Sequence, residues 1–134
     1  MESVYRVLFF LVSQTYEWED DYWDILIEGD LCYEVSLYTL IAAISISFIF
    51  YVVIGRLTTS FQTTLHWAIF AVLAGLVGFL IALSNVKSKI YIDVEIEQFG
   101  YLFSLSNVIW PILYFITSSF IFKYLSLYAR RTPF

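Results

Sequence analysis

The sequence predicts an all-α integral membrane protein: three transmembrane helices, an N-terminal amphipathic interfacial helix and a short β-like segment in the second loop. Composition is the first observation behind this prediction, because 60% of the 134 residues are hydrophobic and 14% are charged. That balance lies outside the range of soluble domains, and a soluble domain of this size would expose apolar patches large enough to aggregate. The second observation is three long stretches without Asp, Glu, Lys or Arg. We expect one membrane domain over 1–134.

The three uncharged stretches, at 35–55, 66–84 and 101–122, are the predicted spans. A helix of about 20 residues is long enough to cross the hydrocarbon core of a bilayer. The first connection, 56–65, is short, so the first two helices should be antiparallel neighbours. Pro111 lies near the middle of the third stretch, and we expect it to kink that helix because it lacks a backbone donor and clashes with the preceding turn.

The second loop, 86–100, has a strand-like pattern. Apolar residues alternate there with polar or aromatic ones, and Gly100 follows. Such a period of two predicts a strand. Its apolar positions are Ile90, Ile92, Val94 and Ile96. The strand would either pair with another chain, since an unpaired edge favours strand addition, or lie flat with its apolar side on the membrane.

The segment 1–34 is acidic and aromatic, and we predict that it lies at the membrane interface. Four carboxylates at i, i+4, i+7 and i+11 of a helix would form one acidic stripe: Glu17, Asp21, Asp24 and Glu28. An apolar face rich in Trp and Tyr would lie beside it. The stripe is either a vestibule that concentrates cations, a docking surface for a basic partner, or a solvated face. Its spacing does not fit a calcium loop.

Charge is distributed unequally between the two ends of the predicted bundle. All twelve acids fall on the side shared by the N-terminal segment and the second loop. The other side, which includes the tail 123–134, carries four of the seven Lys and Arg residues: Arg56, Lys123, Arg130 and Arg131. Arg6, Lys87 and Lys89 lie on the same side as the acids, so the excess of positive charge on the tail side is four against three. Since positive charge favours the cytoplasmic side, we expect a multi-pass protein with its N-terminus outside and its C-terminus on the cytoplasmic (or matrix) side.

The second predicted helix carries small residues at three- and four-residue spacing: Ala71, Ala74, Gly75, Gly78 and Ala82. Such a pattern lets helix backbones approach closely in lipid. It indicates a packed helix, either against other helices of the same chain or between subunits.

The third predicted helix is the most polar one. Asn107, Tyr114 and Ser118 lie near one face at i, i+7 and i+11. This face could line a water-filled path or form hydrogen bonds with a neighbouring helix.

No charged residue falls inside a predicted span, and transporters usually place such groups there. The sequence also shows no nucleophile–base pair, phosphate loop or metal cluster, and its basic residues are too sparse for a nucleic-acid surface. We therefore expect no catalytic residue, no metal and no cofactor. The leading hypothesis is a non-enzymatic membrane subunit that assembles in the lipid bilayer with copies of itself or with other membrane subunits. The alternative is a homo-oligomeric ion-conducting pore with an acidic mouth; phage holins are similar in size and span count alone.

Overall fold

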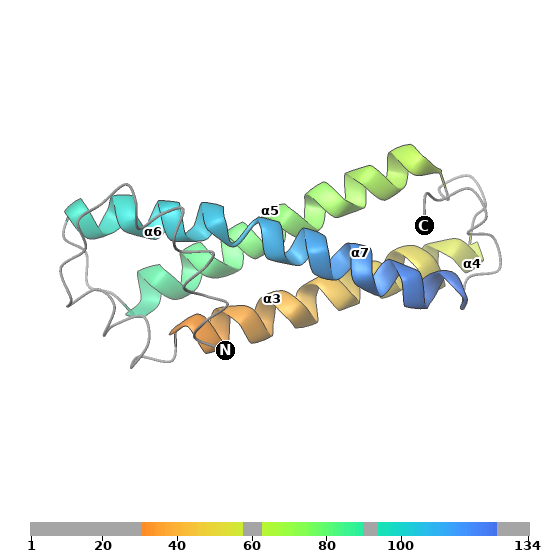
Figure 1. Ribbon diagram of the computed structural model, residues 1–134, viewed down its shortest axis with the longest axis horizontal. Coiled ribbons are helices and arrows are strands. Elements are labelled where there is room, and N and C mark those ends of the chain that lie inside the picture. Colours follow the sequence, from red (N-terminus) through yellow and green to blue (C-terminus); the bar gives the residue numbers. More distant parts are fainter. Residues whose placement is uncertain (1–30, 58–62, 90–93, 126–134) are drawn as a thin grey trace.

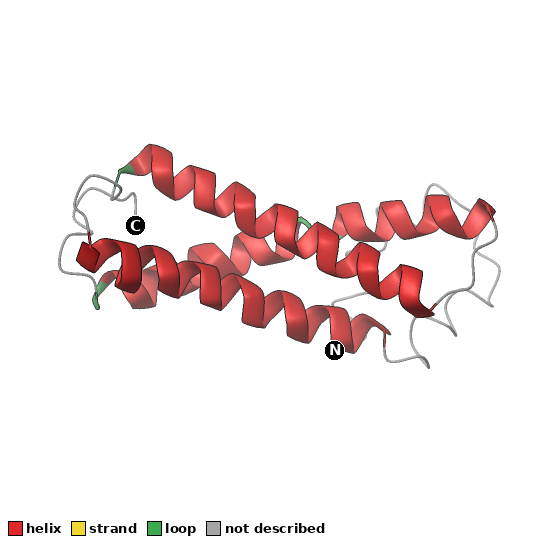
Figure 2. Cartoon of the chain, turned by 180° about the vertical axis from the view of Figure 1, so that it is seen from behind, coloured by secondary structure: helices red, strands yellow, loops and turns green. Residues whose placement is uncertain are grey.

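The computed structural model describes residues 31–57, 63–89 and 94–125, and nearly all of these residues are helical (Figures 1 and 2). In chain order they are α3 (Leu31–Phe48), the π-helix η1 (Ile49–Ile54), α4 (Gly55–Leu57), α5 (Thr64–Lys89), α6 (Val94–Ser106) and α7 (Ile109–Lys123). Within these ranges there is no strand.

Three of the helical stretches are long and apolar enough to cross a membrane, which confirms the three predicted spans. They are Leu31–Leu57, Thr64–Ser88 and Gly100–Lys123. Each extends beyond the uncharged run that predicts it, because the backbone keeps its helical hydrogen bonds into the interface, where Arg56 and Lys87 are exposed and can reach water. The chain therefore fits a multi-pass integral membrane protein.

The spans form a three-helix bundle in which α3, α5 and α7 all contact one another, and α6 contacts α5 (Figure 1). The inward face of α3 is a stripe of buried side chains at every fourth residue: Leu31, Val35, Thr39, Ala43 and Ser47. A four-residue period follows one face of an α-helix. The last three residues of this stripe, Thr39, Ala43 and Ser47, have small side chains, which lets the neighbouring helices lie close.

The π-helical turn η1 changes which face of the first span is buried. Phe50 and Tyr51 are consecutive, yet both side chains are fully buried. A π-helix holds more residues per turn than an α-helix, so neighbouring residues can both face inward. Their rings pack edge to face at 4.9 Å and join Ala71, Ala74 and Phe115 in the core cluster.

The third span is interrupted between α6 and α7, where Asn107 and Val108 form a turn (Figure 2). The interruption lies three to four residues before Pro111, the residue from which the sequence predicts a kink. Because Pro111 has no N–H, it cannot bond to the carbonyl of Asn107, and its ring crowds that carbonyl. The Val108 N–H instead bonds to the Leu105 carbonyl at 3.2 Å, which tightens the turn.

The strand prediction is wrong for Val94 and Ile96, because both residues lie in α6. An isolated strand would leave its backbone N–H and C=O groups without partners, whereas an existing helix extends at low cost. The third helix therefore begins before Gly100. A Cβ at Gly100 would lie 2.9 Å from Val86 Cγ1, so this glycine permits close contact between α6 and α5.

Several predicted features lie outside the described residues. These are Ile90 and Ile92 of the strand-like segment, the N-terminal segment 1–30 and the tail 126–134. The acidic stripe, Glu17, Asp21, Asp24 and Glu28, belongs to this part of the chain.

We predict that Tyr51→Phe stabilises the protein. The Tyr51 hydroxyl is buried without a hydrogen-bond partner in the described part of the chain, and an unsatisfied buried hydroxyl costs about 1–3 kcal/mol. Reversible unfolding in mixed detergent micelles should show a rise in the free energy of unfolding of that order. Tyr33→Phe, at an exposed position of α3, is the control and should change little; a loss of stability in Tyr51→Phe would contradict the prediction.

Candidate functional site: a polar contact between three helices

Asn107 joins all three spans at the point where the third one is interrupted. Its side chain is buried, with 8% exposed. The amide Nδ2 donates one hydrogen bond to Thr39 Oγ1 at 3.0 Å and another to the backbone carbonyl of Gly78 at 3.0 Å. We call Asn107, Thr39 and Gly78 the interhelix contact.

The orientation of the Asn107 amide follows from its partners. A backbone carbonyl can only accept a hydrogen bond, so the NH₂ end of the amide must face Gly78. Both amide hydrogens are then used, one on each neighbouring helix. A carbonyl has two lone pairs, so Gly78 can accept from Asn107 and remain part of α5.

Gly78 is the residue that lets α7 lie against α5. A Cβ at this position would lie 2.4 Å from Pro111 Cγ, which is far inside van der Waals contact. Pro111 is itself fully buried. The same proline that interrupts the third span therefore fills the space left by the missing side chain of Gly78. Gly75 is more tolerant, since a Cβ there would meet Ile112 Cδ1 and Val108 Cγ1 at 3.1 Å, and these are the ends of side chains.

The small-residue face of α5 is occupied within the chain. Gly75 and Gly78 approach α7, and Ala71 and Ala74 lie in the core cluster with Phe50 and Phe115. Ala82 is fully buried. In this structure the face packs the three helices against each other.

The three polar residues singled out on the third helix are separated by the structure. Asn107 and Ser118 are buried in the bundle, whereas Tyr114 is half-buried and stacks on Trp110 at 5.8 Å with an interplanar angle of 24°. Ser118 Oγ donates to the Phe115 carbonyl of its own helix at 3.1 Å. The interruption before α7 helps to separate them, because it disturbs the helical register after Asn107.

Sequence reasoning missed Thr39, and it also missed a second polar contact, in which Trp67 Nε1 donates to Ser119 Oγ at 3.4 Å. The signal for Thr39 is present in the sequence. It occupies one position of the four-residue stripe on α3 and is a polar residue at the centre of a buried face.

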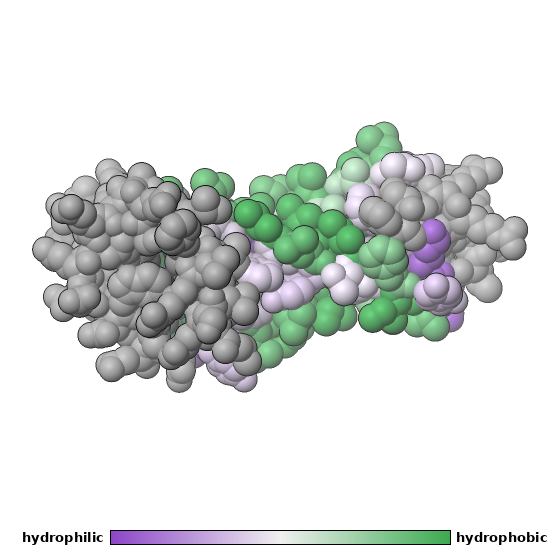
Figure 3. Space-filling view, viewed as in Figure 1, coloured by the Kyte–Doolittle hydropathy of each residue, from purple (hydrophilic) through white to green (hydrophobic). Residues whose placement is uncertain are grey.

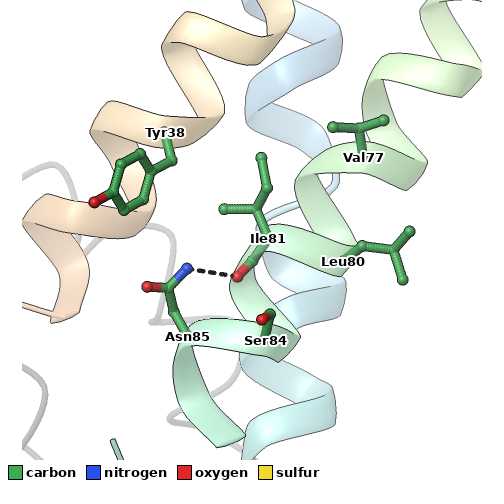
Figure 4. A pocket seen from close by; sticks show the side chains of 6 residues that line it. All are labelled: Tyr38, Val77, Leu80, Ile81, Ser84 and Asn85. Atoms are coloured by element: carbon green, nitrogen blue, oxygen red, sulfur yellow. Dashed lines mark hydrogen bonds between the residues drawn. The ribbon is translucent and has the colours of Figure 1, made fainter. Parts of the chain in front are cut away.

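An open groove of about 500 Å³ lies between α3 and α5 (Figure 4). Its lining residues are Tyr38, Val77, Leu80, Ile81, Ser84 and Asn85. Asn85 Nδ2 donates to the Ile81 carbonyl of its own helix at 2.8 Å, so one of its two amide hydrogens is used locally. The groove is mostly aliphatic and carries no charged side chain.

The described residues contain no group of three or more His, Cys, Asp or Glu that could hold a metal ion. His66 is part of a helix cap: Thr63 Oγ1 accepts from the His66 backbone N–H at 3.4 Å, and 2.6 Å separates Thr63 Oγ1 from His66 Nδ1. A threonine at this position caps the first turn of α5.

We predict that Gly78→Ala destabilises the bundle while Gly75→Ala has little effect. Overpacking a tight core costs about 1–3 kcal/mol, and the obstacle at Gly78 is a rigid proline ring. At Gly75 the neighbouring side-chain ends can shift, and alanine favours a helix by about 1 kcal/mol over glycine. Unfolding in mixed micelles measures both variants. If Pro111 is the obstacle, the cost of Gly78→Ala should fall by at least half in a Pro111→Ala background; an unchanged cost would refute it.

Asn107→Ala should lower the free energy of unfolding by about 1–3 kcal/mol, because it removes two hydrogen bonds between helices and leaves a cavity. Thr39→Val keeps the shape and removes one bond, so it should cost about 0.6–1.5 kcal/mol. The control is Ser106→Ala, since Ser106 Oγ bonds to Leu102 of its own helix at 2.9 Å. Equal effects of Asn107→Ala and Ser106→Ala would show that the interhelix contact contributes nothing.

The chain matches no protein-family model, no curated protein sequence and no solved structure.

Proposed function

We propose that the chain is a non-enzymatic membrane subunit that functions by assembling into a homo- or hetero-oligomeric membrane complex. The observation that supports this proposal most is where the polar side chains of the spans form their hydrogen bonds. The Asn107 amide and the Trp67 indole bond to other helices of the same chain, and several serine and threonine hydroxyls bond to their own backbone. The bonds of Asn107 and Trp67 hold helices together, as in a scaffold, and the hydroxyls are used within their own helices.

The outward faces support assembly. Large apolar side chains are exposed along all three spans, including Ile41, Leu76 and Ile121. Green, hydrophobic surface covers much of the visible middle of the molecule (Figure 3). Three helices bury a small share of their apolar surface in each other, so further helices can pack on the outside without displacing any contact of the bundle.

The distribution of charge suggests the orientation of the subunit in the membrane and the kind of partner that it binds. We propose the N-terminus outside, with an amphipathic helix in the acidic segment before α3 lying at the interface. Arg56 and Lys123 lie at the ends of spans on the opposite side, where positive charge is favoured. In this arrangement Glu17, Asp21, Asp24 and Glu28 form an acidic surface outside the membrane, suited to a basic partner or to cations.

A homo-oligomeric pore is the second candidate, and the one-sided distribution of the acids favours it. Rings of acids at a pore mouth concentrate cations. Asn107 and Ser118 are buried within one bundle, so such a pore would run between copies and be lined by outward residues of the spans.

The mass of the gently extracted complex separates these candidates. A subunit of a larger assembly should be recovered with other proteins in fixed ratio, or as a defined multimer of itself that does not conduct. A pore should be recovered as a ring of one species that conducts in planar bilayers. In a pore, changing the four stripe acids to Gln or Asn should weaken cation preference. A monomer under all gentle conditions would refute the assembly proposal.

A further inference from the structure

The groove between α3 and α5 has an apolar end and a polar end. Val77 lies at one end, and Ser84 and Asn85 lie at the other (Figure 4). The span of α5 ends at Ser88. At 1.5 Å per residue, Val77 lies roughly 16 Å inside that end of the span and Asn85 roughly 5 Å inside it. The groove therefore leads from the hydrocarbon region of the membrane to its interface.

The polar end of the groove offers hydrogen-bond donors. The second amide hydrogen of Asn85 has no partner in the described part of the chain, and neither have the hydroxyls of Ser84 and Tyr38. Near the end of a span these donors lie at the depth of the ester and phosphate groups of lipids. The oxygens of those groups accept hydrogen bonds, and a phosphate accepts strong ones.

A cation lies beside the polar end of the groove. Lys87 is at i+7 from the lining residue Leu80, so the two lie on nearly the same side of α5. Lys87 Nζ lies 5.8 Å from the centroid of the Tyr101 ring, and Tyr101 is in the first turn of the third span. Tyrosine favours the headgroup level, so this cation–π contact holds the ammonium there. Lys87 forms no ion pair with a described carboxylate.

We propose that the groove binds one phospholipid of the surrounding membrane. An acyl chain lies along Val77, Leu80 and Ile81, and the phosphate lies at Lys87, with Ser84 and Asn85 bonding to the oxygens between. Along the groove the chemistry changes in the order in which it changes along a phospholipid. The groove volume of about 500 Å³ is within the range of about 300–1,000 Å³ that is typical of ligand sites. One chain supplies the whole site, so this inference does not depend on the proposed assembly.

The lining of the groove favours a lipid over another helix. Close contacts between helices in membranes use small residues, and the small-residue face of α5 is occupied within the chain. The groove has large side chains instead, such as Leu80 and Tyr38, which are 60% and 50% exposed. A flexible acyl chain follows such an uneven surface more closely than a helix does. Lipid phosphate also supplies, at the end of the span, the negative charge that complements Lys87.

Mass spectrometry of the intact protein in detergent tests the binding. Phosphatidylglycerol is added at increasing concentration, and the diacylglycerol with the same two chains is the matched control because it lacks only the phosphate headgroup. The protein should retain one phosphatidylglycerol per chain. It should bind this lipid about fivefold or more tightly than the diacylglycerol, the size expected for one lysine near an anionic lipid. Equal affinities would overturn the role of the phosphate.

Lys87→Gln tests the polar end. It should lower the affinity for phosphatidylglycerol about fivefold and leave the affinity for diacylglycerol unchanged, because only the attraction to the phosphate is lost. Arg56→Gln removes an exposed cation at the opposite end of the bundle and should change neither affinity. An equal loss in both variants would show that net charge, and not the position of Lys87, sets the affinity.

Ile81→Trp tests the apolar end. The larger side chain takes the space of the acyl chain, so the affinity for both lipids should fall about tenfold or more. The same substitution at Ile69, which lies near the other end of α5 and is 52% exposed, should leave both affinities unchanged. Unfolding in mixed micelles checks that each variant is folded. If Ile81→Trp does not fold, the exposed Lys87→Gln still decides the outcome.

Photo-cross-linking shows where the lipid lies. In micelles, a phospholipid with a photoreactive group in one chain should label the peptides that contain Tyr38 and Ile81. Even labelling of all three spans would overturn the groove as the site. In a Cys32→Ala background, dimers formed through a disulfide at Leu80→Cys would show that a second copy covers the groove and would overturn the lipid. A strict monomer that still retains one phospholipid would refute the assembly proposal and leave this inference standing.

Discussion

The two hydrogen bonds of the Asn107 amide connect the third span to the first and to the second, and the arrangement of the bundle depends on them. Hydrocarbon supplies no substitute for water, so a polar side chain in a span must find its partners on other helices or on its own backbone. Asn107 finds one on each neighbouring span, at Thr39 and Gly78. A two-donor group that bridges two helices sets both the depth and the rotation of the third.

Gly78 and Pro111 make this bridge sterically possible. The proline ring occupies the position that a side chain at Gly78 would take, and the interruption that the proline imposes places Asn107 at the turn between α6 and α7. One residue thus breaks the helix, packs against α5 and positions the amide. The rest of the small-residue face, from Ala71 to Ala82, continues the same close contact along α5.

The apolar runs predict the spans well, because crossing a bilayer demands length and the absence of charge, and both are local properties. Contacts between helices are not local. The partner of Asn107 and the π-turn at Phe50 and Tyr51 depend on how the spans rotate against each other, which no single span encodes. The error at Val94 and Ile96 has a different origin: a two-residue period over a short segment fits a strand, but a neighbouring helix extends through it. Pro111 predicts a distortion of the third span. The distortion lies at Asn107 and Val108, because the proline has no N–H to donate to the carbonyl of Asn107.

The interruption of the third span also bears on how the chain comes together in the membrane. It divides that span into α6, which contacts α5, and α7, which contacts α3 and α5. The spans are synthesised in order, so α3 and α5 are present before the third arrives. The contact of Asn107 needs all three and closes last. Until the third span arrives, the Thr39 hydroxyl and the Gly78 carbonyl lack the Asn107 amide as a hydrogen-bond donor. Its arrival completes the contact between the three spans.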